Sequence, residues 1–80
     1  MYRWVHQTKN RYYQAHLLQD LFGEWTLVRV WGGLGSHQGA VRTTGVSSYA
    51  DGLAQIQAIG KRRQQHGYLP VVDAYSTQNG

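Results

Sequence analysis

Cysteine is absent from this 80-residue sequence, and acidic residues, proline and long apolar runs are scarce. Without cysteine the chain can form neither a disulfide framework nor a thiolate metal site. No apolar run approaches the roughly 18 residues of a membrane span, and the N-terminus lacks the apolar segment of a secretory signal. We therefore expect a soluble, unprocessed, cytoplasmic protein with no membrane partner.

The shortage of acidic residues argues against catalysis. General acid–base chemistry by paired carboxylates needs environments that push two pKa values apart, and no such pair is evident. The four histidines are scattered with no short metal-ligand spacing. We predict no enzymatic activity, no cofactor, no metal and no small-molecule substrate; the four acidic residues are Asp20, Glu24, Asp51 and Asp73.

Arginine dominates the charge of the chain. Six arginines and two lysines give a formal net charge of +4. A guanidinium can form two parallel hydrogen bonds to a phosphate or carboxylate, which suits nucleic-acid recognition. A net charge of this size also simply keeps a small domain in solution, so composition leaves both interpretations open.

The middle of the chain, residues 25–35, is the stretch around which the rest is organised. Its apolar and β-branched residues alternate with period two and predict a central strand from Trp25 to Trp31. We expect the glycines at 32, 33 and 35 to end that strand abruptly. Trp31 would then lie at a strand end beside bare backbone, although a lone strand tryptophan is also a candidate core residue.

The flanking segments predict further strands at 2–7, 11–19 and 40–46. The apolar residues 68–72 either form a short final strand or simply pack against the rest of the domain. The first three strands should form an antiparallel meander, and the less apolar strand 40–46 should lie at an edge. Ser48, with Asp51 three residues later, marks a helix start, and Gly67 a left-handed C-cap. An apolar stripe along this helix supplies a cover for the sheet; its residues are Tyr49, Leu53, Ile56 and Gly60.

These patterns predict an α+β fold, a twisted antiparallel sheet of four or five strands wrapped around a single helix at about residues 48–66. Eighty residues suffice for one small core. We expect a single domain over residues 1–72 and a flexible C-terminal tail over residues 73–80, where little apolar surface remains to be buried.

Several spaced motifs resemble the WGR domain, a small module of eukaryotic poly(ADP-ribose) polymerases and of many bacterial proteins. The similarity spans roughly residues 10–70, and the third letter of the family signature, arginine, is replaced by Gly33. It implies a small bacterial DNA-binding protein with a core of Tyr13, Trp25, Leu27, Leu53, Ile56 and Tyr68. The motifs are Asp20-Leu21-Phe22-Gly23-Glu24-Trp25, Leu27-Val28-Arg29, Trp31-Gly32, Gly35, Gly39, Lys61-Arg62-Arg63 and Gly67-Tyr68.

The resemblance also implies a site. In DNA-damage-responding polymerases the signature tryptophan packs against the nucleotide at a strand end, and basic residues contact the backbone. By similarity we expect a non-catalytic module that binds nucleic acid, DNA in preference to RNA, at backbone and strand ends with little sequence specificity. The alternative is a protein-interaction module that docks through the Trp31 face or the helix end. The candidate nucleic-acid-binding residues are Trp31, Gly32, Arg29, Arg42, Lys61, Arg62 and Arg63.

Overall fold

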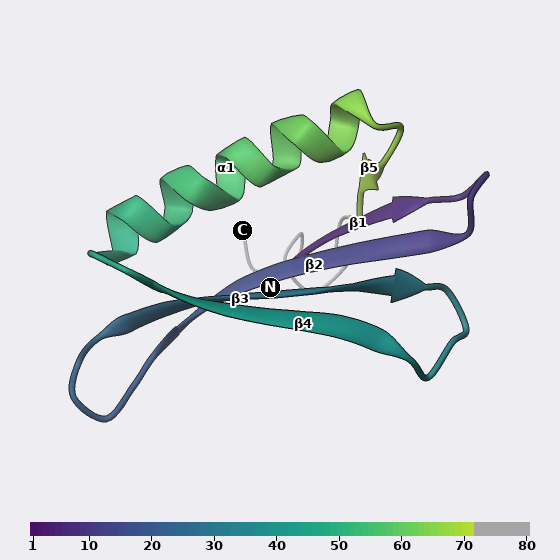
Figure 1. Ribbon diagram of the computed structural model, residues 1–80. Coiled ribbons are helices and arrows are strands. Elements are labelled where there is room, and N and C mark those ends of the chain that lie inside the picture. The colour runs from purple at the N-terminus through teal and green to yellow at the C-terminus, as the bar shows by residue number, and fades with distance from the viewer. Residues whose placement is uncertain (72–80) are drawn as a thin grey trace, which may run out of the picture.

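A computed structural model describes residues 1–71 as five strands and one helix (Figure 1). The flexible tail predicted for residues 73–80 lies outside the described residues. The elements follow the predicted order, with helix bounds shifted by one residue at each end. They are β1 (Tyr2–His6), β2 (Arg11–Gln19), β3 (Trp25–Gly33), β4 (Gly39–Val46), α1 (Tyr49–Gln65) and β5 (Leu69–Pro70).

The five strands form one open antiparallel sheet in the order β4-β3-β2-β1-β5. This order confirms the meander of the first three strands and the edge position of β4. Helix α1 lies across one face of the sheet (Figure 1). The α+β class is confirmed, whereas the wrapping of the sheet around the helix stays a prediction.

The prediction that the glycines end β3 was wrong, because the strand runs on through Gly32 and Gly33. Gly32 pairs with Tyr12 on β2 and with Gly39 on β4. A Cβ at Gly32 would lie 3.1 Å from the Gln38 carbonyl oxygen and 3.2 Å from the Gly39 Cα. Glycine here lets neighbouring backbones approach closely within the strand, and the chain turns only at Gly35, where φ is +77°.

Both ends of α1 are capped as the sequence predicts. The Ser48 hydroxyl accepts a hydrogen bond from the Asp51 N–H at 3.0 Å, although the Asp51 carboxylate reaches back to Ser47 rather than to Ser48. At the C-terminus, Gly67 has φ +90° and the Tyr68 N–H donates to the Arg63 carbonyl at 2.9 Å. This pattern is a Schellman motif, which fixes the direction in which the chain leaves the helix.

The core lies between α1 and the sheet. Of the six predicted core residues, Trp25 and Leu53 are only half-buried, while Trp4 and Ala15, which were not predicted, are buried. Trp25 lies at one end of the sheet, where Tyr49 packs on its ring at 5.0 Å. The buried core residues are Trp4, Tyr13, Ala15, Leu27, Ile56 and Tyr68.

Candidate nucleic-acid interface

Trp31 lies near the end of β3, on the face that α1 covers. Its ring stacks on Tyr13, with ring centroids 5.6 Å apart and planes inclined by 12°, and packs against the buried core. The indole is nonetheless only half-buried and lines an open hollow. Trp31 therefore combines the two roles that the sequence left open, a packing residue and an accessible aromatic surface.

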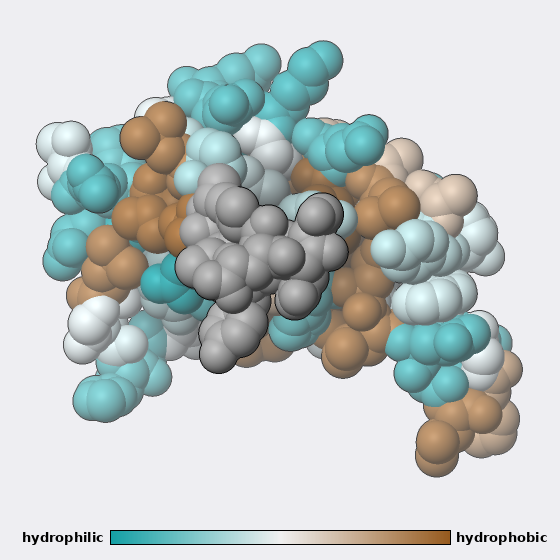
Figure 2. Space-filling model, turned by 180° about the vertical axis from the view of Figure 1, so that it is seen from behind, coloured by the Kyte–Doolittle hydropathy of each residue, from teal (hydrophilic) through white to brown (hydrophobic). Residues whose placement is uncertain are grey.

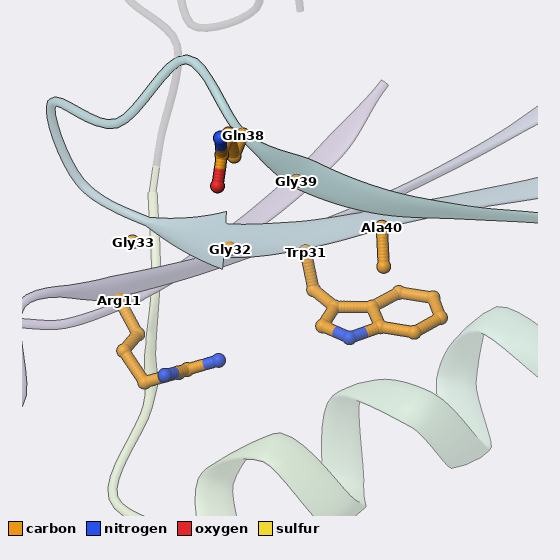
Figure 3. Close-up of a pocket in the computed structure, with 7 residues that line it drawn as sticks. All are labelled: Arg11, Trp31, Gly32, Gly33, Gln38, Gly39 and Ala40. Carbon is orange, nitrogen blue, oxygen red and sulfur yellow. The ribbon is translucent and has the colours of Figure 1, made fainter.

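The hollow beside Trp31 has a volume of about 320 Å³. Figure 3 shows Trp31, Ala40 and Arg11 extending from the same side of the strands, with the Arg11 guanidinium directed toward the indole. An aromatic ring and a cation beside open backbone suit the base or sugar of a nucleotide together with its phosphate. The other lining residues are Gly32, Gly33, Gln38 and Gly39.

Arg29 and Arg42 are direct cross-strand neighbours in the middle of β3 and β4. Directly opposed residues point to the same face of a sheet, and Trp31 follows Arg29 by two positions on that face. Like charges so placed repel each other, and the Arg29 Nε is buried without a hydrogen-bond partner among the described residues. The register thus brings both arginines to the Trp31 face, and a bound anion would relieve their repulsion.

The three consecutive basic residues near the end of α1 do not share one surface. Lys61 and Arg62 are exposed, whereas Arg63 is half-buried. The Arg63 guanidinium lies 4.6 Å from the ring centroid of Tyr13 and 5.2 Å from that of Tyr68, which are cation–π distances. Arg63 therefore belongs with the aromatic stack of Tyr13, and Lys61 and Arg62 form a separate exposed pair.

Arg11 is the charged residue of this hollow, and the sequence analysis missed it. It pairs with Gly33 across β2 and β3, so it lies beside the position where the family signature has arginine. A Cβ at Gly33 would meet only ordinary contacts, 3.7 Å from Ser36 Cβ and 3.9 Å from the Asn10 carbonyl oxygen. A side chain would fit at Gly33, and Arg11 provides a cation next to it.

The turns and the two ends of α1 fall at opposite ends of the sheet (Figure 1). Apart from Arg3, Arg29 and Arg42, which lie within strands, the charged residues of the described chain lie at one end or the other. The basic end, residues 7–11, 31–39 and 61–67, contains the β1–β2 and β3–β4 turns and the C-terminus of α1; its cations are Lys9, Arg11, Lys61, Arg62 and Arg63. The acidic end, residues 19–25 and 46–51, contains the β2–β3 loop and the N-terminus of α1. It holds every acidic residue of the described chain, namely Asp20, Glu24 and Asp51.

Helix stabilisation explains only part of this separation. An acidic residue in the first turn and basic residues in the last turn favour the helix dipole, which accounts for Asp51 and for residues 61–63. Lys9 and Arg11 lie outside the helix, however, in and after the β1–β2 turn. Their presence at the basic end gives the molecule a field that attracts a polyanion to one end.

Asp51 is held in its charged form at the acidic end. The Ser47 backbone N–H and hydroxyl each donate to its carboxylate at 3.1 Å, and the Gln55 side chain donates at 3.4 Å. These hydrogen bonds, the backbone one first, lower the pKa of Asp51 below its ordinary value. The carboxylate therefore serves to anchor the start of the helix.

Residues 1–71 were considered for two further kinds of feature, a cluster of metal ligands and a membrane-spanning helix. No group of three or more potential ligand side chains gathers there, and no helix in that range has the length and apolar character needed to cross a bilayer. The described site is built from cations, aromatic rings and glycine backbone.

The sequence profile of the WGR domain matches residues 2–75. The chain belongs to the WGR family. WGR domains are non-catalytic nucleic-acid-binding modules of poly(ADP-ribose) polymerases and related proteins. No curated protein and no solved structure gives a significant match.

Proposed function

We propose that this WGR domain binds DNA without catalysis, through the phosphate backbone and the strand end, and with little sequence specificity. The observation that carries the proposal is the position of Trp31, a half-buried aromatic ring within the basic end and far from every described carboxylate. Family membership supports the nucleic-acid class of the ligand.

The residues of the site are better suited to contact the phosphate backbone of a nucleic acid than to recognise the edges of its bases. Sequence readout needs side chains that enter a groove and bond base edges, whereas phosphate contacts position a protein without reading sequence. Arg11, Arg29 and Arg42 lie on the Trp31 face and offer cations for about three phosphates. Neutralising three phosphates gives a log–log salt slope of about −2.7.

A fluorescence-anisotropy titration of a short 5′-phosphorylated duplex tests the proposal, with Trp31→Ala compared with Trp25→Ala at two salt concentrations. Both tryptophans lie on the same face of β3 and both are half-buried, but Trp25 lies at the acidic end. Loss of one stacking contact costs about 1–3 kcal/mol, so Trp31→Ala should weaken binding by roughly tenfold or more, while Trp25→Ala should leave the affinity of the folded protein unchanged.

Two further ligands in the same titration test the preference for strand ends and the preference for DNA. A duplex whose ends are closed by hairpin loops reports the contribution of the strand end, and an RNA duplex of the same sequence reports the preference for DNA. We expect weaker binding to both. Absence of binding to every duplex at low salt by folded protein would refute the DNA proposal and favour the alternative, a protein-docking module whose binding depends little on salt.

A further inference from the structure

The β2–β3 loop exposes two large apolar side chains at the tip of the acidic end. Leu21 is 100 % exposed and Phe22 90 %. Figure 2 shows this tip as a protruding apolar point at the lower right, separated from the rest of the apolar surface by polar residues. Leu18, 53 % exposed, adds apolar surface at the base of the loop. Exposed apolar groups gathered in this way mark interaction sites.

The backbone of the tip is fixed by its own hydrogen bonds. The Asp20 carboxylate accepts from the Phe22 N–H at 2.8 Å and from the Glu24 N–H at 2.9 Å. The Asp20 N–H donates to the Glu24 carbonyl at 2.9 Å, and Gly23 takes the left-handed turn position with φ +81°. Phe22 and its neighbour are therefore presented on an ordered loop, which lowers the entropy cost of binding a partner.

The charge around the tip selects the class of partner. Asp20 and Glu24 flank the two apolar residues, and Asp51 lies at the same end of the molecule. A polyanion such as nucleic acid or an anionic lipid surface is repelled by these carboxylates. An apolar group with an acidic border is instead complementary to a protein pocket with an apolar floor and a basic rim.

The geometry points to a second, independent binding function: Leu21 and Phe22 form a docking tip for a partner protein that offers an apolar pocket bordered by lysine or arginine. The tip does not compete with the Trp31 hollow. The six residue-to-residue steps of β3 from Trp25 to Trp31 span about 20 Å at the usual strand rise, so the chain can hold a protein at one end and nucleic acid at the other. In that arrangement it acts as an adaptor.

The experiment begins with site-specific photo-crosslinking of the full chain in the cells that express it. A benzophenone amino acid replaces Phe22 in one sample and Val41, an exposed apolar residue on β4 (66 % exposed), in the control. A protein captured through position 22 and not through position 41 is then purified and titrated with the wild-type chain, Phe22→Ser and Glu24→Lys. Capture alone does not establish the interaction; the titration decides.

We expect Phe22→Ser to weaken binding of the purified partner by roughly tenfold or more, because the partner pocket no longer buries the phenylalanine ring. Glu24→Lys should weaken it by a smaller factor that declines as salt is raised. Both variants should keep the melting temperature and the affinity for duplex of the wild type. Phe22 carries almost no packing in the fold, so loss of binding would not reflect unfolding.

Three results would overturn the proposal: no adduct specific to position 22, an adduct only with a second copy of this chain, or a purified partner that binds Phe22→Ser as tightly as wild type. Failure of the DNA proposal would be visible separately, as absence of duplex binding by the unmodified chain. The two functions are therefore tested by different ligands and different variants.

Discussion

The Arg11→Gln variant gives the sharpest test of the basic end. Arg11 is exposed, pairs with Gly33 and lines the Trp31 hollow. Arg3 supplies the control, because it pairs with Gln14 on the opposite face of the sheet, where its guanidinium lies 5.2 Å from the Tyr12 ring centroid. Arg3→Gln and Arg11→Gln each remove one positive charge, so a difference in their affinities for duplex reflects where that charge lies on the protein.

The expected magnitude follows from counterion release. Each neutralised phosphate adds about −0.9 to the slope of log affinity against log salt. Loss of the Arg11 contact should therefore change the slope from about −2.7 to about −1.8, with affinity falling about eightfold at 0.1 M salt and only about twofold at 0.4 M. Arg3→Gln should change affinity by less than about twofold, because charges beyond about 10 Å are screened at 0.1 M salt.

The assay is fluorescence anisotropy of the labelled 5′-phosphorylated duplex at four or more salt concentrations, with thermal melts of both variants as a folding control. Exposed substitutions usually change stability by no more than about 0.5 kcal/mol, so Arg11→Gln should melt close to wild type. Equal losses of affinity for the two variants, or a loss with Arg11→Gln that persists at 0.4 M salt, would refute the placement of phosphate at the basic end.

Three further predictions address the signature, the core and the helix cap. Gly33→Arg should steepen the salt slope by about 0.9 and raise affinity for duplex about eightfold at 0.1 M salt, whereas Gly45→Arg, at a site with no atom within 4 Å of an added Cβ, should do neither. The Leu27 side chain is 1 % exposed, so in urea denaturation Leu27→Ala should lower the free energy of unfolding by about 2–5 kcal/mol. Leu21→Ala, at a fully exposed side chain, should lower it by less than about 0.5 kcal/mol. The pKa of Asp51 is lowered in the fold, so its carboxylate stabilises the folded state above the ordinary aspartate pKa of about 3.9 and loses that effect as pH falls through the lower folded pKa. The difference in urea midpoint between wild type and Asp51→Asn should therefore close at low pH. A constant difference from pH 6 to pH 2.5 would contradict this prediction.

Local chemistry made part of the fold predictable. Strand β2 was predicted with its observed bounds, Arg11–Gln19, because it is rich in the aromatic residues that strands prefer and follows a polar connection of hairpin length. The C-cap at Gly67 was predicted from a glycine after a basic last turn. In both cases the determining interactions join residues close in the chain, so the sequence carries the signal directly.

The continuation of β3 through Gly32 was not predictable in this way. Its cause is the close approach of Gln38, Gly39 and Tyr12, and their proximity depends on strand register. Read alone, the glycines indicate only flexible backbone. The strand continues because pairing on both sides satisfies its hydrogen bonds, which is a property of the assembled sheet.

Two features of the sequence bear on the positions of Arg11 and Arg63 in the site. The sequence predicts one strand that ends at Gln19 and another that begins at Trp25; if these two residues pair across the loop, antiparallel register places Arg11 opposite Gly33. Arg63 follows Ile56 by seven residues, so it continues the inward stripe of the helix and separates from its basic neighbours. Hairpin register and helical phase, applied to charged residues as well as apolar ones, would have found both.

The antiparallel meander turns a sequence of mixed charge into a molecule with a basic end and an acidic end. Along the chain basic and acidic segments alternate: Lys9 and Arg11, then Asp20 and Glu24, later Asp51 and the basic residues 61–63. Successive connections of an antiparallel sheet fall at opposite ends, and α1 runs back from the acidic end to the basic end (Figure 1). The strand length sets the separation at about 20 Å, about twice the screening length at 0.1 M salt. A polyanion at one end and a basic protein pocket at the other therefore meet nearly independent electrostatic fields. The net charge of +4 describes neither the positive field at the basic end nor the negative field at the acidic end.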